Sequence, residues 1–154
     1  MTQRIGFITV CTALLAIGTA CSAGVSPPAE LDPTNDTCTI CRMAVSDRRV
    51  AAQVVERGEE PRFFDDIGCL AKFLAERGQR EAAVYVADHR TGEWTPAASA
   101  VYSRLPRAST PMASGLVAHA TQESRAQDAE AGGSVPVEAS SVIGDRGSGA
   151  RVRP

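Results

Sequence analysis

A single helix signal, between residues 66 and 78, constrains the fold of this chain more strongly than any other feature. Its apolar residues recur at the three- and four-residue spacing that buries one face of a helix: Ile67, Leu70, Ala71 and Leu74. Asp65 or Asp66 can cap its N-terminus, and Gly78 can end it. Strand-like segments lie on both sides of this helix, so the sequence predicts an α+β fold.

The segments around this helix predict the order strand, strand, helix, strand. Residues 50–56 are rich in Val and Ala, and a turn containing Gly58 and Pro61 leads into a short stretch at 62–64. These two segments are expected to pair as a hairpin. Residues 82–87 then predict a buried strand after the helix.

The same order of elements can be followed a second time from Trp94 onward. A strand is predicted up to residue 103 and a second at 115–120. A helix is then predicted at 123–131 and a strand at 135–142. The two halves share negligible sequence identity. The order of elements alone therefore leaves an internal duplication open.

The first 20 residues are typical of an export signal and not of a folded element. Arg4 precedes a short apolar run, and small residues stand directly before Cys21. This junction resembles a bacterial lipobox, although Gly18 replaces the usual branched apolar residue, and it predicts cleavage before Cys21 and lipidation of its thiol. The alternative is ordinary cleavage near Ala20, which leaves Cys21 as a free thiol.

The rest of the chain divides into a linker at 21–36, a domain at 37–143 and a disordered tail at 144–154. We expect the lipid to hold this domain on the extracytoplasmic face of the cell membrane. The formal net charge is -2, so no basic excess suggests nucleic acid as a partner.

Three cysteines follow Cys11 and Cys21, and their spacing predicts a soft-metal site. Cys38, Cys41 and Met43 form a Cys-x-x-Cys-x-Met arrangement, and thiolate with thioether selects Cu(I) over harder ions. The third cysteine, Cys69, lies in the first turn of the predicted helix, where the positive helix end favours a thiolate. An odd number of thiols cannot all pair within the chain, so at least one is free, metal-bound or bonded elsewhere.

Other interpretations of these cysteines stay open. Cys38 and Cys41 can form a disulfide or a redox pair, and Met43 can be a core side chain. The three cysteines can also form a structural zinc site, for which Asp66 and His89 are the only nearby candidates as fourth ligand. Under either alternative, the protein is an interaction or assembly module.

Few residues outside this cluster predict chemistry. Met112 lies in a loop where an apolar residue has little reason to be buried, so it is a further candidate ligand. His119 alternates with Val117 on a strand and is expected to be half-exposed, whereas His89 is expected to be solvated in a turn. The adjacent aspartates before the helix are explained as a cap, and no catalytic motif indicates an enzyme.

Several motifs together closely resemble the NosL family of copper lipoproteins. They follow one another along nearly the whole mature domain as Cys38-Thr-Ile-Cys-Arg-Met43, Phe64-Asp-Asp-Ile-Gly-Cys-Leu70, Val84-Tyr-Val-Ala-Asp88, Thr110-Pro-Met112 and Gly132-Gly133. The resemblance implies two similar ββαβ units in tandem, at about 37–90 and 93–143, in which each small antiparallel sheet carries one helix.

The resemblance also implies a function and a set of ligands. Cys41 and Met43 fall on the primary Cu(I) ligands, and Cys38 and Cys69 belong to the subgroup with the fuller cysteine set. The implied protein is an accessory factor without catalysis that supplies copper for nitrous oxide reductase maturation, with that enzyme or an assembly factor as its partner. We expect it to be a monomer. Many members have Phe at the position of His119, so the role of this histidine stays open.

Overall fold

The computed structural model describes residues 25–78, 82–107 and 109–145. The predicted signal at 1–20, the predicted lipidation site Cys21 and the predicted tail beyond residue 145 lie outside these ranges. Within the described segments, no helix is long and apolar enough to cross a membrane.

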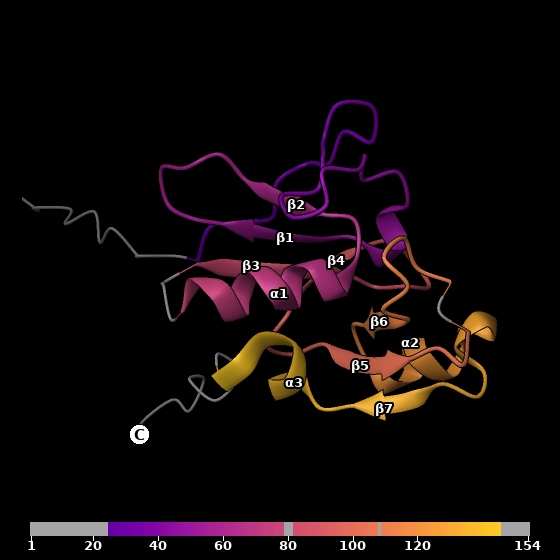
Figure 1. The fold of residues 1–154 in the computed structure, drawn as a ribbon. Helices are drawn as coiled ribbons and strands as arrows, with labels where there is room; N and C mark the ends of the chain where they lie inside the picture. Colours follow the sequence, from indigo (N-terminus) through magenta and orange to yellow (C-terminus); the bar gives the residue numbers. More distant parts are fainter. Residues whose placement is uncertain (1–24, 79–81, 108, 146–154) are drawn as a thin grey trace, which may run out of the picture.

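The first sheet contains four antiparallel strands in the order β2-β1-β3-β4. Their bounds are Ala52–Val55 for β1, Arg62–Phe64 for β2, Ala83–Ala87 for β3 and Trp94–Pro96 for β4. In the turn between β1 and β2, Gly58 has a φ of 77°, which glycine adopts readily because it has no side chain. Helix α1, Ile67–Arg77, follows β2, and Figure 1 shows it lying against the sheet.

The second sheet contains three antiparallel strands in the order β6-β5-β7. They are β5, Val101–Arg104, β6, Leu116–His119, and β7, Val135–Val137, with the short helices α2, Gln122–Ala126, and η2, Ala129–Ala131, between the last two. In each sheet the first strand is central, and it lies between the second strand and the strand that follows the helix. This shared topology confirms the expected α+β fold of two similar ββαβ units.

Two elements of the second unit differ from their predictions. The helix predicted at 123–131 is divided, because Asp128 leaves the helical path and its side chain accepts a hydrogen bond from the Glu130 N–H at 2.9 Å. The strand predicted at 135–142 ends at Val137, and Ala139–Ile143 forms helix α3. Helix α3 packs on α1 and buries Val142 and Ile143, so these apolar residues enter the core from a helix.

The two units share one core. Helix α1 contacts strands of both sheets, and the buried cluster joins Phe64, Ile67 and Leu70 to Tyr102 and Leu116. On the polar side of this junction, the His89 N–H donates to the Ala118 carbonyl at 2.8 Å, and the Ala120 N–H donates to Asp88 Oδ2 at 2.7 Å. The units are therefore fixed to one another by packing and by hydrogen bonds.

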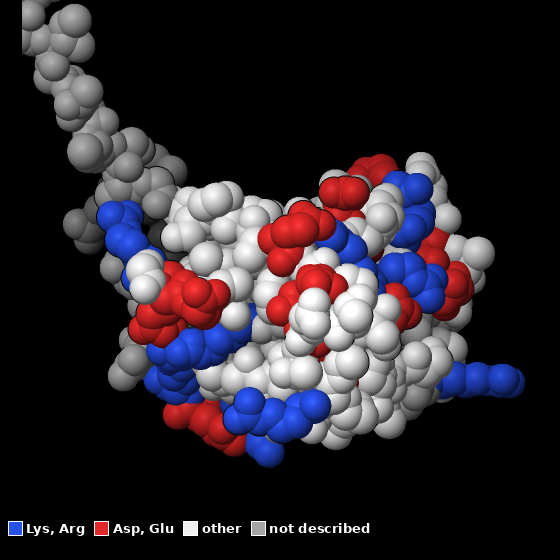
Figure 2. All heavy atoms as spheres, turned by 90° about the horizontal axis from the view of Figure 1, so that it is seen from above, with Lys and Arg blue, Asp and Glu red and all other residues white. Residues whose placement is uncertain are grey.

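Part of the stretch expected as a linker lies against the first sheet. Ala29 exchanges two hydrogen bonds with the side chain of Gln53, and the Tyr85 hydroxyl donates to the carbonyl of Ser26. Leu31 is buried in the core. Figure 2 shows acidic and basic side chains interspersed over the face seen from above, with uncharged surface between them.

Candidate metal centre

A closed loop between residues 37 and 44 positions the first two cysteines. The Cys38 N–H donates to the Met43 carbonyl at 2.8 Å, and the Arg42 N–H donates to the Cys38 carbonyl at 3.0 Å. Arg42 takes a φ of 67°, a conformation that costs a residue with a side chain about 1 kcal/mol. The Thr39 N–H donates to the Phe63 carbonyl at 2.9 Å, which ties the loop to β2.

Two adjacent carboxylates at the end of β2 lead into α1. Successive side chains of an extended chain point to opposite sides, so Asp65 and Asp66 face different partners. Asp66 is the helix cap and accepts hydrogen bonds from the Gly68 N–H at 2.6 Å and the Thr110 hydroxyl at 2.6 Å. Asp65 points to the cysteine loop, and both carboxylates are buried.

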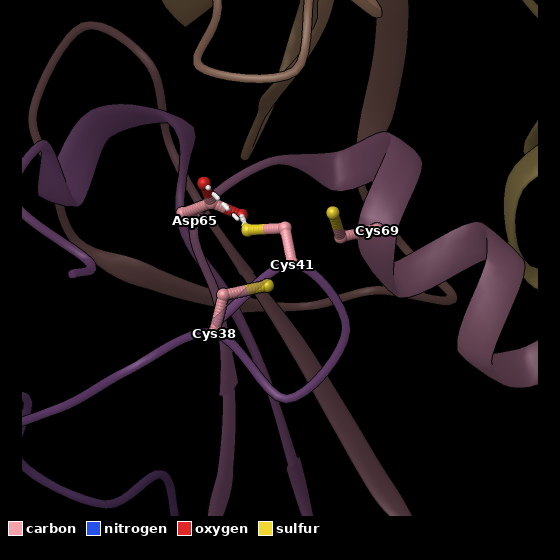
Figure 3. A group of neighbouring side chains, drawn as sticks. All are labelled: Cys38, Cys41, Asp65 and Cys69. Carbon is pink, nitrogen blue, oxygen red and sulfur yellow. Dashed lines mark hydrogen bonds between the residues drawn. The ribbon is translucent and has the colours of Figure 1, made fainter. Parts of the chain in front are cut away.

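Four side chains converge at this point, as Figure 3 shows: Cys38, Cys41, Asp65 and Cys69. One potential ligand atom from each lies within 4.8 Å of the others. Both carboxylate oxygens of Asp65 lie 3.2 Å from the Cys41 Sγ, which donates to them. All three cysteines are free thiols, and Cys38 and Cys69 are buried while Cys41 is half-buried. The group can hold a metal ion through three sulfurs and a carboxylate.

Burial keeps the thiols of Cys41 and Cys69 protonated. It raises the pKa of Cys41 to about 11, an effect to which Asp65 and Cys38 add. Burial also raises the pKa of Cys69, and the neighbouring Cys38 and Asp65 raise it further. The thiolate expected at Cys69 from the helix end alone is therefore wrong, because burial outweighs the dipole. A metal ion that binds here must displace protons.

The two methionines of the described segments differ from the cysteines in their exposure. The side chains of Met43 and Met112 are 42% and 48% exposed. Met43 is tied to the cluster through its backbone, since its carbonyl accepts from the Cys38 N–H, whereas the Met112 N–H donates at 3.0 Å to Asp66 Oδ2, in the helix cap next to the cluster. Met43 is thus not the buried core side chain of the alternative interpretation.

Asp65 is the site residue that the sequence did not predict. Both aspartates were explained as a helix cap. Because one capping side chain is enough for a helix, the second carboxylate was the sequence signal that could have identified Asp65 as a site residue. The two candidates for a fourth zinc ligand are placed elsewhere. Asp66 is committed to the helix end and the Thr110 loop, and His89 hydrogen-bonds to Asp128 at 2.6 Å.

The two histidines are buried, contrary to prediction. His89 is 3% exposed and His119 is 0% exposed. Their ring nitrogens lie 2.6 Å and 2.8 Å from the same oxygen of Asp128. The expectation of a solvated turn histidine failed because the turn after β3 docks on β6, which covers the ring.

Comparison with known proteins shows which family the sequence matches. A family model for NosL matches residues 28–140, a range that contains all four residues of the metal centre. No curated protein and no solved structure matches the chain.

Proposed function

This chain belongs to the NosL family, and we propose that it binds Cu(I) at Cys38, Cys41 and Cys69 and transfers it to a copper enzyme. Membership of the family suggests a copper-binding accessory role. The observation that carries the proposal is the convergence of three free thiols at one buried point. Thiolate sulfur is a soft ligand that favours Cu(I), Zn²⁺ and iron–sulfur clusters over hard ions such as Mg²⁺, Ca²⁺ and Mn²⁺.

The exposed methionines supply a route to the buried thiols. A thioether carries no proton, so Met43 and Met112 can bind Cu(I) without a deprotonation step, whereas Cys41 must lose its proton first. We infer that Cu(I) meets the thioethers first and then moves inward. As the bond between copper and Cys41 Sγ forms, the S–H bond breaks and its proton leaves to solvent by way of the Asp65 carboxylate, 3.2 Å away. The reverse proton transfer weakens copper binding during release.

The location and the acceptor form a further part of the proposal. Lipidation of Cys21 would hold the domain at the extracytoplasmic face of the cell membrane and raise its effective concentration near a membrane-associated acceptor. The resemblance described above points to nitrous oxide reductase maturation as the destination of the copper. Both points rest on the sequence motifs.

A structural zinc site is the second candidate function, and Asp65 favours it. Three sulfurs and one carboxylate satisfy the tetrahedral preference of Zn²⁺. A zinc site with these four ligands leaves the exposed thioethers without a role, because thioether sulfur is a ligand for Cu(I) and not for Zn²⁺. The exposed methionines therefore separate the two functions.

Competition for Cu(I) tests the proposal. The reduced full-length protein is titrated into a coloured complex of Cu(I) with a bidentate chelator, and the loss of colour gives the affinity. We expect Cys41→Ser to weaken uptake at least tenfold, and Met43→Leu to slow uptake more than it changes affinity. Val117→Thr, which places a hydroxyl at a fully buried position of the second sheet, is the control and should leave uptake unchanged.

Two results would contradict copper transfer. One is failure of the reduced protein to take Cu(I) from the chelator. The other is tightly bound Zn²⁺ that Cu(I) does not displace, which would assign the group to the structural alternative.

A further inference from the structure

A second cluster of potential ligands lies at the junction of the two units. His89 Nδ1 and His119 Nε2 both face Asp128 Oδ2, at 2.6 Å and 2.8 Å, and the three atoms lie within 4.8 Å of one another. The two rings meet edge to face with centroids 5.9 Å apart. The side chains are 3%, 0% and 7% exposed, so the cluster is shut off from bulk water.

The carboxylate of Asp128 is fixed and ionised. Burial would raise its pKa, but hydrogen bonds from His89 and His119 outweigh burial and lower the pKa to about 2. Its other oxygen, Oδ1, accepts the Glu130 N–H at 2.9 Å. One oxygen therefore holds the backbone while the other is aimed at the two imidazoles.

Two buried polar atoms on neighbouring strands of the second sheet are unpartnered within the described residues. Nδ1 of His119 and Oγ of Ser103 are both buried without a hydrogen-bond partner in the described segments. Val101 pairs with His119 and Ser103 pairs with Val117, so Ser103 and His119 are diagonal neighbours on one face of the sheet. Diagonal Cβ atoms are about 7–8 Å apart, which leaves room for one bridging water. A hydroxyl can donate or accept, so Ser103 suits either tautomer of the ring.

A further carboxylate lies beside the cluster. Asp88 is buried beside Ala118 and Ala120, and hydrogen bonds from Ser124 and from backbone N–H groups outweigh burial and lower its pKa to about 2.

We propose that His89, His119 and Asp128 form a second metal site, for a divalent cation of the Zn²⁺ class. Imidazole with carboxylate suits Zn²⁺ and lacks the sulfur that favours Cu(I). The ion binds the three facing atoms, and the proton on each facing ring nitrogen moves to the other nitrogen of the same ring, so no proton is lost. Zinc ligands in a tetrahedron lie about 3.3 Å apart, so the ring of His89 withdraws from Asp128 by about 0.7 Å and that of His119 by about 0.5 Å. The ion joins the two units.

The far nitrogen of His119 needs a hydrogen-bond acceptor once the metal is bound. When Nε2 binds the ion, Nδ1 carries the proton and donates a hydrogen bond to a water, which in turn donates to Ser103 Oγ. Such supporting hydrogen bonds typically change metal affinity by about 10–100-fold. Ser103 is therefore a positioning residue for this site.

Nitrogen NMR of the imidazole rings tests the site directly, because the sequence contains two histidines. Zn²⁺ is titrated into the ¹⁵N-labelled full-length protein. We expect the ¹⁵N signals of His89 Nδ1 and His119 Nε2 to move to metal-bound chemical shifts once one equivalent of Zn²⁺ has bound at this site. Asp128→Asn keeps an oxygen that can cap η2 but removes the ligand, and it should abolish both shifts. Ser103→Ala should weaken binding at least tenfold.

Asp47→Asn is the matched control. Asp47 caps the short helix η1, Arg48–Val50, as Asp128 caps η2, but its carboxylate does not face both rings. This variant should keep both ring shifts. The site is refuted if Zn²⁺ leaves the ring signals of the wild type unchanged, or if the shifts persist in Asp128→Asn. Zinc taken only by the thiols would change the cysteine Cβ signals and leave the rings unchanged, which also refutes this site while leaving the thiol centre intact.

Discussion

At the scale of single residues, the metal centre depends on two neighbouring carboxylates with different partners. Asp66 closes the N-terminus of α1, whereas Asp65 accepts the Cys41 thiol. The carboxylate disfavours a negative sulfur beside it, because like charges repel at short distance. Asp65 therefore adds to burial, the larger effect, in keeping Cys41 protonated until a metal ion arrives.

Removal of this charge should make Cys41 more acidic. In Asp65→Asn the amide oxygen can still accept the thiol, but the negative charge is gone, so the pKa of Cys41 should fall below about 11. The pH dependence of the ¹³Cβ shift of Cys41 measures this pKa. Asp32→Asn, a change of the same kind at an exposed turn, is the control. An unchanged or higher pKa in Asp65→Asn would show that burial alone governs the thiol.

Copper affinity should rise with pH. The pKa values of Cys41 and Cys69 are raised by burial, so both thiols are protonated at neutral pH and copper must displace their protons. Each displaced proton contributes a factor of about ten in apparent affinity per pH unit. Chelator competition at several pH values measures how steeply the copper affinity rises with pH. Cys41→Ser should lower the number of displaced protons by one. A pH-independent affinity would exclude the thiols as ligands.

The sequence predicted the cysteines of the cluster better than their neighbours. Local spacing is visible in a sequence, so Cys38 and Cys41 could be assigned together, and Cys69 followed from the helix signal. The contact between Cys41 and Asp65 spans 24 residues and arises from the hairpin that brings β2 beside the loop. The burial of His89 and His119 likewise depends on docking of the second unit, which local patterns do not encode.

At the scale of elements, the start of α1 and the loop after Thr110 fit closely together. A Cβ at Gly68 would lie 2.8 Å from the Cβ of Ser114 and 2.9 Å from Asp66 Oδ1. The glycine therefore allows the Met112 loop to dock beside the metal centre. The same loop is held by the bonds from Thr110 and Met112 to Asp66.

Gly68→Ala should destabilise the protein despite its better helix propensity. Propensity would gain about 1 kcal/mol, but the forced separation of the loop and helix should cost more, for a net loss of about 1–2 kcal/mol. Urea denaturation of the reduced protein measures the change. Gly132→Ala is the control, since its nearest contact, with the Ala129 carbonyl, is 3.4 Å away. Equal stability of Gly68→Ala and wild type would mean that the loop adapts without cost.

Element prediction succeeded where the pattern was long and failed where it was short. The 11 residues of α1 span three helical turns, so their apolar face was unambiguous. The five residues of α3 offer one turn, and Val142 and Ile143 fit a strand equally well in isolation. The contact of α3 with α1 decides their conformation.

At the scale of the whole molecule, Asp128 links the second unit to the turn after β3. The pKa of this carboxyl is about 2 in the folded state, compared with an ordinary value of 3.8. A lowered folded pKa adds stability above the unfolded pKa, and this stability is lost as pH falls through the folded pKa. The contribution is about 2 kcal/mol at neutral pH.

Acid should therefore remove the advantage that Asp128 provides. With metal ions chelated, Asp128→Asn should be less stable than wild type by about 2 kcal/mol at neutral pH. The difference should shrink between about pH 4 and pH 2, as the wild-type carboxyl takes up its proton. Urea denaturation at several pH values gives both curves. Parallel curves down to the lowest pH would show that Asp128 contributes through packing alone.

The order in which the chain is made matters for its thiols. Helix α3, near the end of the chain, supplies Val142 and Ile143 to the core around α1. During synthesis, the core of the first unit is therefore incomplete until residue 143 has emerged. For that period, α1, which carries Cys69, lacks the apolar contacts that α3 supplies in the folded protein. Addition of α3 thus completes the core in which Cys69 is buried.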